Sequence, residues 1–166
     1  MIVLGVDPGS LRTGWGIIER CGSKLRYVAA GVIDARPRRE LHRRLHTIYA
    51  GLSEVIAVHR PSEMAVEDIF HAHNVRSALT LGQARGVALL AGASADLPIS
   101  AYPPALVKRS VAGRGRAPKD QLARIVGAIL GLRDLPGPDA TDALAIAITH
   151  ANARGLPVSR RAGGLC

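Results

Sequence analysis

The opening residues limit the fold of this chain more than any other segment does. Ile2 to Asp7 carries apolar residues on both faces of an extended segment, and Pro8-Gly9 ends the run. A strand that is apolar on both faces is typical of the middle of a sheet whose two sides are covered. The opening segment therefore predicts an α/β protein with this strand near the centre of its sheet.

Two further strands follow, with a turn signal between them, so a three-stranded meander opens the chain. They cover Gly14 to Glu19 and Leu25 to Ile33. Beyond them, helical periods alternate with short apolar strands. The predicted strands there are Met64 to Val66 and Ile99 to Tyr102, and the predicted helices are Arg38 to Val58, Asn74 to Ala93, Ala105 to Val111, Lys119 to Leu130 and Asp139 to Ala153. We therefore expect a mixed five-stranded sheet, antiparallel at first, flanked by helices.

Length and composition predict one globular domain. The 166 residues are 48% hydrophobic and 21% charged, which is enough for a core and excludes extensive disorder. Residues 1–153 are expected to form the domain, and residues 154–166, which lack periodicity, a flexible tail. The apolar runs are shorter than the ~18 residues of a membrane span, and the two cysteines make no disulfide framework. We expect a soluble, cytoplasmic protein that binds no membrane.

The net charge indicates the class of partner. Lys and Arg number 22 against 13 Asp and Glu, so the formal net charge is +9. A surplus of this size on one domain favours a polyanionic partner, most often nucleic acid, over the alternative of a basic surface without a partner. Aromatic residues are only 3% of the chain, which argues against an extended base-stacking surface.

Two acids stand where predicted strands end. Asp7 closes the opening strand, and Glu67 follows Met64 to Val66. Open α/β sheets bind ligands outside the carboxyl ends of their strands. Each acid has a plain alternative, since Asp7 begins an Asp-Pro-Gly turn and Glu67 could simply mark the exit of a strand into solvent. Alternation places Asp68 on the opposite face from Glu67. Asp68 and Glu63 are the neighbouring acids that could be mistaken for the functional one.

A second pair of acids opens the last predicted helix. Asp139 and Asp142 are three residues apart, which stacks both carboxylates on one helix face. The alternative is a capping role, with Asp139 as N-cap and Asp142 supporting the first turn. The helix behind them is nearly all apolar, so the pair starts from a buried element.

Together these four acids predict a metal-dependent site. Carboxylates that converge repel one another and raise their own pKa values unless a cation lies among them. Oxygen ligands without cysteine or clustered histidine suit Mg²⁺ or Mn²⁺ rather than zinc. A pair of such ions can catalyse displacement at phosphorus, and a basic surface would hold a phosphodiester over them.

The motifs that carry these acids resemble the RuvC-type Holliday-junction resolvases, also called crossover junction endodeoxyribonucleases. The match is collinear from residue 2 to about residue 152. Its segments are Asp7-Pro8-Gly9-Ser10, Val66-Glu67-Asp68-Ile69-Phe70, Ser77-Ala78-Leu79 with Leu81-Gly82-Gln83-Ala84-Arg85-Gly86, and Asp139-Ala140-Thr141-Asp142-Ala143-Leu144-Ala145-Ile146-Ala147.

The resemblance implies a ribonuclease-H-like fold and a homodimer that resolves four-way DNA junctions by paired symmetric nicks during recombination and repair. It implies Mg²⁺ as cofactor, with Mn²⁺ as a substitute, and a branch-migration motor complex as partner. The family's metal-binding and catalytic acids match Asp7, Glu67, Asp139 and Asp142. Its two basic residues near the site match Lys108 and Lys119.

Further residues are expected at the DNA. Phe70 is the only phenylalanine, and the resemblance places a junction-contacting aromatic there. His71 and His73 follow it in a polar loop. The other expected phosphate contacts are Arg76, Arg114 and Arg116, together with Lys108 and Lys119.

Small residues recur along the helix predicted at Asn74 to Ala93. Ala78, Gly82 and Gly86 form a ridge that either packs on the chain's own sheet or makes a two-fold dimer contact.

Two other functions remain open from the residues alone. Gly5 to Ser10 with Thr13-Gly14 resembles the phosphate loop of actin-like and sugar-kinase-like nucleotide-binding proteins, although that superfamily needs two such domains. A basic DNA-binding module without catalysis is the second alternative. Mg²⁺-dependent nicking of a synthetic four-way junction would exclude it.

Overall fold

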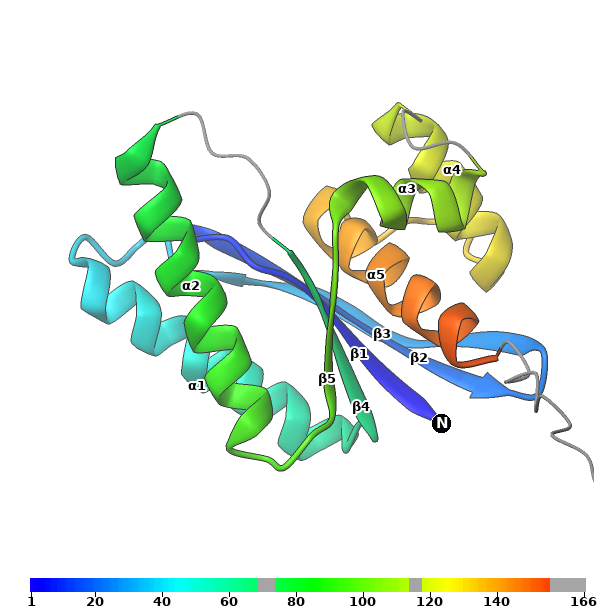
Figure 1. The fold of residues 1–166 in the computed structure, drawn as a ribbon, viewed down its shortest axis with the longest axis horizontal. Coiled ribbons are helices and arrows are strands. Elements are labelled where there is room, and N and C mark those ends of the chain that lie inside the picture. The colour runs from blue at the N-terminus through cyan, green and yellow to red at the C-terminus, as the bar shows by residue number, and fades with distance from the viewer. Residues whose placement is uncertain (69–73, 114–117, 156–166) are drawn as a thin grey trace, which may run out of the picture.

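The computed structural model describes residues 1–68, 74–113 and 118–155 (Figure 1). Its strands are β1 (Ile2–Asp7), β2 (Arg12–Cys21), β3 (Lys24–Asp34), β4 (Glu63–Glu67) and β5 (Ile99–Tyr102). Its helices are α1 (Leu41–His59), α2 (Val75–Ala93), α3 (Pro104–Ala112), α4 (Lys119–Leu130) and α5 (Pro138–Gly155). All the predicted elements are present.

The strands form one mixed sheet in the order β3-β2-β1-β4-β5, with the opening strand in the centre. The pairs β3-β2 and β2-β1 are antiparallel, whereas β1-β4 and β4-β5 are parallel. Val6 pairs with Val66 and Glu67 pairs with Tyr102, so the carboxyl ends of three neighbouring strands lie at one edge of the sheet. The prediction of a mixed five-stranded sheet is confirmed.

Helices cover both faces of the sheet (Figure 1). The pair α1 and α2 packs on one face, around a core that contains Leu4, Val6 and Val66. The other face is covered by α5 together with α3 and α4, around a core that contains Val3 and Ala65. Because successive side chains of a strand point to opposite faces, Asp7 and Glu67 lie on the α5 side and Asp68 lies on the α2 side.

Helix α5 lies directly against the strands because two glycines leave room for it. A Cβ on Gly5 would overlap the carbonyl oxygen of Ala143, and one on Gly14 would overlap the carbonyl oxygen of Asp139. Since Gly14 is paired with Asp7, this close approach brings the start of α5 beside the end of β1.

The structure differs from the sequence prediction mainly at element boundaries. The hairpin strands β2 and β3 run further, to Cys21 and from Lys24, because their backbone pairing continues to the turn beyond the apolar residues. Arg154 belongs to α5 rather than to the expected tail, and residues 156–166 lie outside the described part of the chain. Across the residues that the structure describes, no helix has the length and apolar character needed to cross a membrane.

Candidate active site

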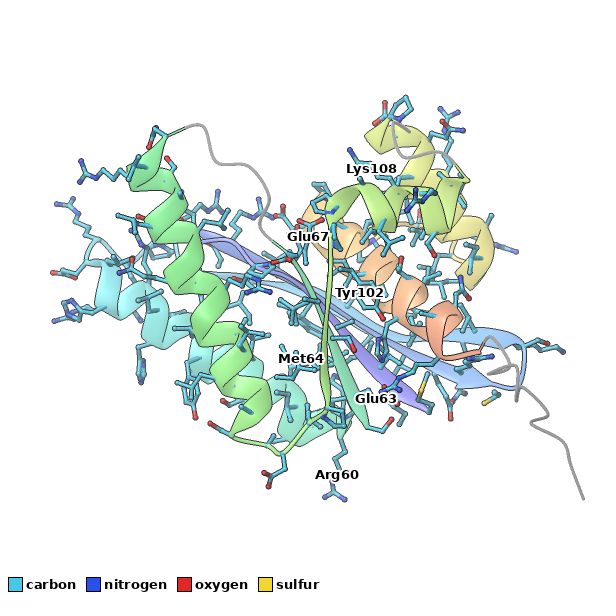
Figure 2. The ribbon with its side chains drawn as sticks, viewed as in Figure 1. Arg60, Glu63, Met64, Glu67, Tyr102 and Lys108 are labelled. Carbon is cyan, nitrogen blue, oxygen red and sulfur yellow. The ribbon has the colours of Figure 1, made fainter. Side chains whose placement is uncertain are left out.

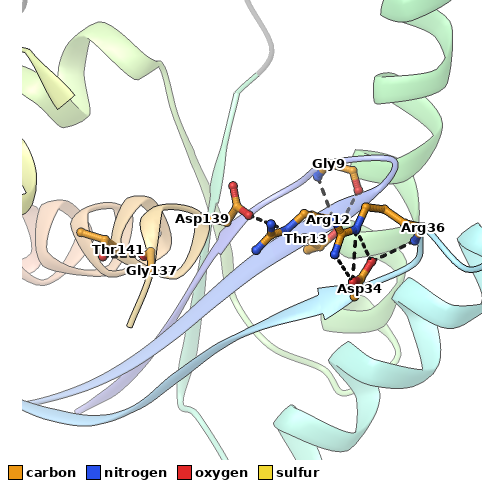
Figure 3. Close-up of polar contacts among 8 residues, drawn as sticks. All are labelled: Gly9, Arg12, Thr13, Asp34, Arg36, Gly137, Asp139 and Thr141. Carbon is orange, nitrogen blue, oxygen red and sulfur yellow. Dashed lines mark hydrogen bonds and ion pairs between the residues drawn. The ribbon is translucent and has the colours of Figure 1, made fainter. Parts of the chain in front are cut away.

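The site lies where β1 and β4 end side by side beneath α5. Asp7 and Glu67 are the last residues of these two strands, and both lie on the face that α5 covers. The turn that follows Asp7 is held by Thr13, whose hydroxyl donates a hydrogen bond to the carbonyl of Gly9 at 2.9 Å (Figure 3). The fold therefore brings together two acids that are sixty residues apart in the chain.

Helix α5 adds the third acid. A pocket of about 310 Å³ is lined by Asp7, Glu67 and Asp142, with Lys108 from α3. Pro104, Val107 and Leu122 complete its wall. Figure 2 shows Glu67 and Lys108 at the same end of the molecule, with Glu63 at the opposite end of β4. The pocket thus combines three carboxylates, one ammonium group and an apolar back wall.

The electrostatics of Asp7 reflect this gathering of like charges. Its pKa is raised from 3.8 to about 8, first because burial disfavours the charged form. The negative charges of Glu67 and Asp142 raise the pKa further, as do a side-chain hydrogen bond with Glu67 and the charge of Asp139. The negative charges of all three other candidate acids therefore contribute to the raised pKa of Asp7, and a nearby cation would offset their repulsion.

The fourth acid has a cationic partner. Asp139 lies in the first turn of α5, after Pro138, and its Oδ2 is 2.8 Å from Nε of Arg12 (Figure 3). The turn itself is closed by Thr141, whose backbone amide and hydroxyl both donate to the carbonyl of Gly137. This is not the N-cap arrangement that sequence left open, since Asp139 is inside the helix.

The donor set suits a hard divalent ion, although the acids are not drawn together as metal ligands. Three carboxylates line the pocket, and carboxylate oxygens are ligands that Mg²⁺ and Mn²⁺ prefer. In the described residues, no three His, Cys, Asp or Glu side chains are grouped closely enough to hold a metal ion as they stand. Asp139 is not part of the pocket lining and pairs with Arg12 instead.

Arg85 is a contributor to the site that the sequence analysis missed. From α2, its Nε donates to the backbone carbonyl of Glu67 at 3.2 Å, and its Nη2 lies 3.0 Å from Oδ1 of Asp68. The guanidinium therefore fixes the end of β4 from the face opposite the pocket. The motif Leu81 to Gly86 contained this arginine, but only the contact across the sheet shows its partner.

The other predicted residues are placed as follows. Lys108 lines the pocket, whereas Lys119 begins α4 and its side chain is not described. Arg76 lies outside the acidic pocket, in a hollow of about 380 Å³ that it shares with Ser10. The predictions for Phe70, His71, His73, Arg114 and Arg116 fall outside the described residues.

A second polar cluster lies at the other end of β4. The carboxylate of Glu63 accepts hydrogen bonds from Nε2 of His150 at 2.8 Å and from Nε of Arg154 at 2.9 Å. The ring of His150 is fully buried, and its Nδ1 is 2.8 Å from the hydroxyl of Tyr102. Burial alone would raise the pKa of Glu63, but these two hydrogen bonds and the positive charges behind them lower it below its usual 4.5.

Known proteins share both the sequence and the fold. The family model described as crossover junction endodeoxyribonuclease RuvC matches residues 3–150. The RuvC protein of Geobacter metallireducens is 51% identical over 156 residues, which is 94% of this chain and 95% of that protein. The RuvC protein of Geobacter sulfurreducens is 53% identical over 152 residues, covering 92% of this chain and 93% of that protein.

A solved structure agrees with the fold. Thermus thermophilus RuvC in complex with a Holliday-junction substrate superimposes with a TM-score of 0.87 at 38% identity, covering 93% of this chain and 95% of that one. The expectation of a ribonuclease-H-like sheet flanked by helices is thereby confirmed.

Proposed function

This chain belongs to the RuvC family of crossover junction endodeoxyribonucleases, and we propose that Asp7, Glu67, Asp139 and Asp142 are the acids with which it resolves Holliday junctions. The observation that carries the assignment is the pocket at the strand ends, where Asp7 is held among the other carboxylates. A buried carboxyl whose pKa is strongly raised and which lies among other acids in a pocket is typical of a functional site.

The four acids would hold Mg²⁺, with Mn²⁺ as a substitute, because their hard oxygens match these ions. When bound, such ions supply Lewis-acid stabilisation to the negative oxygens of a phosphodiester. The raised pKa of Asp7 supports this role, since burial and the neighbouring negative charges both disfavour its charged form, and a cation would offset these effects.

The chain's own residues would bind and orient the scissile phosphate. Hydrolysis adds one water across a P–O bond of the DNA backbone, and negative charge accumulates on the phosphoryl oxygens as the bond breaks. Lys108 lines the same pocket as the acids and would stabilise that charge. Lys119, at the start of α4, is proposed to assist in the same way.

Junction binding would use the basic surface around the pocket. The net charge of +9 favours contact with DNA phosphates, and Arg76 is exposed beside the turn that follows β1. We assign the remaining contacts to Phe70, Arg114 and Arg116 from the family resemblance, with Phe70 stacking near the crossover. A branch-migration motor complex is proposed as a further partner on the same ground, and the cytoplasm as the site of action.

Paired symmetric nicks require two active sites, and α2 offers a surface for a second copy of this chain. Val75, Leu79 and Leu90 of this helix are 77%, 65% and 56% exposed, which is unusual for large apolar side chains. Between them, a Cβ on Gly82 or Gly86 would meet nothing within 4 Å.

The small-residue ridge of α2 therefore faces away from the chain's own sheet, on which Ala84, Ala88 and Ala91 pack instead. A two-fold contact between α2 helices would cover the apolar stripe and relate two active sites by the symmetry of a four-way junction.

The activity assay uses a labelled synthetic four-way junction and a linear duplex, each with Mg²⁺ and with chelator. We expect nicking of the junction with Mg²⁺ only. Asp7→Asn should abolish cleavage but retain junction binding, because it removes negative charge from the pocket. Glu54→Gln, which changes an exposed acid on α1, should cut at the wild-type rate. Wild-type cleavage by Asp7→Asn would refute the assignment of the site.

A further inference from the structure

Arg12 is a cation held by one of the four acids. It begins β2, and its Nε is 2.8 Å from Oδ2 of Asp139 (Figure 3). The side chains of Arg12 and Asp139 are 42% and 33% exposed. An ion pair this open to solvent is weak, so another cation can displace the arginine.

The fold places Arg12 at this position. Arg12 and Gly14 are two residues apart on β2 and therefore lie on the same face, and Gly14 is backed against the carbonyl of Asp139. The neighbouring Arg36 is engaged elsewhere, since its Nη2 is 2.6 Å from Oδ2 of Asp34 and its Nε 2.9 Å from Oδ1 (Figure 3). Two arginines thus share this corner of the molecule, and only Arg12 forms an ion pair with Asp139.

We propose that Arg12 is an internal counter-ion that competes with the divalent ion for Asp139. The inference rests on the proposed role of Asp139 as a ligand. A guanidinium and a divalent ion beside one carboxylate repel each other, so the arginine has to withdraw as the ion binds. Without the ion, Arg12 offsets part of the negative charge of the site and keeps Asp139 apart from the acids that line the pocket. Arg12 is accordingly a positioning residue that sets how much metal the enzyme needs.

The competition predicts an effect on metal affinity that does not depend on cleavage. Exposed ion pairs of this kind change binding equilibria by about two- to fivefold. Arg12→Gln should therefore lower the dissociation constant for Mn²⁺ by about two- to fivefold. Arg12→Lys retains the positive charge and should bind Mn²⁺ close to the wild-type value. Arg36→Gln is the matched control, because it removes a neighbouring arginine whose ion pair is with Asp34, and its effect should be less than half that of Arg12→Gln.

The measurement is a titration of DNA-free protein with Mn²⁺, in which free Mn²⁺ is counted by electron paramagnetic resonance. A thermal melt of each variant confirms that it is folded. Unchanged or weaker Mn²⁺ binding by Arg12→Gln would overturn the inference, as would equal tightening by Arg36→Gln.

Asp139→Asn separates this inference from the proposed function. If Asp139→Asn loses Mn²⁺ affinity while Arg12→Gln behaves as wild type, the competition is wrong and the acidic site stands. If Asp139→Asn binds Mn²⁺ as the wild type does, Asp139 is not a ligand, and both the site assignment and the competition fail.

Discussion

The two ends of β4 carry glutamates in opposite electrostatic settings. At its start, Glu63 accepts hydrogen bonds from His150 and Arg154, and its pKa is lowered. At its end, Glu67 shares a pocket with Asp7 and Asp142, and the pKa of Asp7 is raised. The first carboxylate is paired with two basic side chains, whereas the second lies in a pocket with two further carboxylates. The gathering of carboxylates at the end of β4 is the reason that we propose the active site there.

Exchanging a carboxylate for an amide at each end of β4 tests this comparison most strongly. We expect Glu67→Gln to reduce junction cleavage by at least about 10³-fold while the protein stays folded, because one of the carboxylates proposed to hold the catalytic ion is lost. Glu63→Gln should retain cleavage per folded molecule and instead lower the melting temperature. Single-turnover cleavage and thermal melts of both variants provide the measurements, and an inactive but fully stable Glu63→Gln protein would contradict the contrast.

Removing the buried His150 should show how much the polar cluster around Glu63 contributes to stability. His150→Ala leaves a cavity and deprives Glu63 and Tyr102 of their partner. Loss of a buried, hydrogen-bonded side chain costs about 2–4 kcal/mol of unfolding free energy. Urea denaturation of the metal-free protein measures this cost. Thr149 is a buried neighbour whose hydroxyl donates to the carbonyl of Ala145 in the same helix, and Thr149→Val, the control, should lose clearly less.

The end of β4 beside Asp7 should behave in the opposite way. Because Asp7 destabilises the fold when charged, Asp7→Asn should raise the unfolding free energy of the metal-free protein at neutral pH, by about 1–3 kcal/mol. The folded pKa of about 8 lies above the usual 3.8, so the folded state binds the extra proton. The contribution of Asp7 to stability is thus fully present below pH 3.8 and is lost as pH rises through about 8. The advantage of the variant should therefore grow from pH 4 to pH 8.

Asp34 gives the control for this pH series. Arg36 lowers the pKa of Asp34 to about 2, chiefly because the side chain and the backbone amide of Arg36 both donate hydrogen bonds to the Asp34 carboxylate. Asp34→Asn should consequently give no gain in stability at any pH in the series. Thermal melts with chelator present make the measurement, and an equal gain from Asp34→Asn would show that net charge alone is responsible.

The smallest expected effect concerns Arg85, which supports Glu67 from the opposite face of the sheet. Arg85→Lys keeps the charge beside Asp68 but loses the fork that also reaches the carbonyl of Glu67. We expect a decrease of about 5- to 20-fold in the cleavage rate at saturating junction, equal to roughly 1–2 kcal/mol. Junction affinity, measured by gel shift with chelator, should be unchanged. A fall in affinity with an unchanged rate would place Arg85 in DNA binding instead.

Much of this arrangement could be predicted from the sequence. Strand alternation alone placed Glu67 and Asp68 on opposite faces, and the structure confirms it, since Glu67 lines the pocket and Asp68 meets Arg85 of α2. The apolar opening strand correctly predicted the centre of the sheet. These features depend on local periodicity, which a single sequence carries.

The features that were missed depend on contacts between distant side chains. Nothing in the local sequence of Arg12 distinguishes it from Arg36, yet only one of the two forms an ion pair with Asp139. Likewise, His150 lies on α5 and its partner Glu63 lies on β4, and no sequence pattern connects these two segments. For Ala78, Gly82 and Gly86, spacing alone left two orientations open, and only the packing of α2 decided between them.

The close packing of α5 on the sheet restricts which residues can stand beneath the start of this helix. The helix presses on β2 at Gly14, where one additional carbon would overlap the backbone of Asp139. Gly14→Ala would add a methyl group at that point and push the start of α5 away from the strand ends, although every acid would remain in the chain. The position of Asp139 beside the strand ends therefore depends on the missing side chain of Gly14.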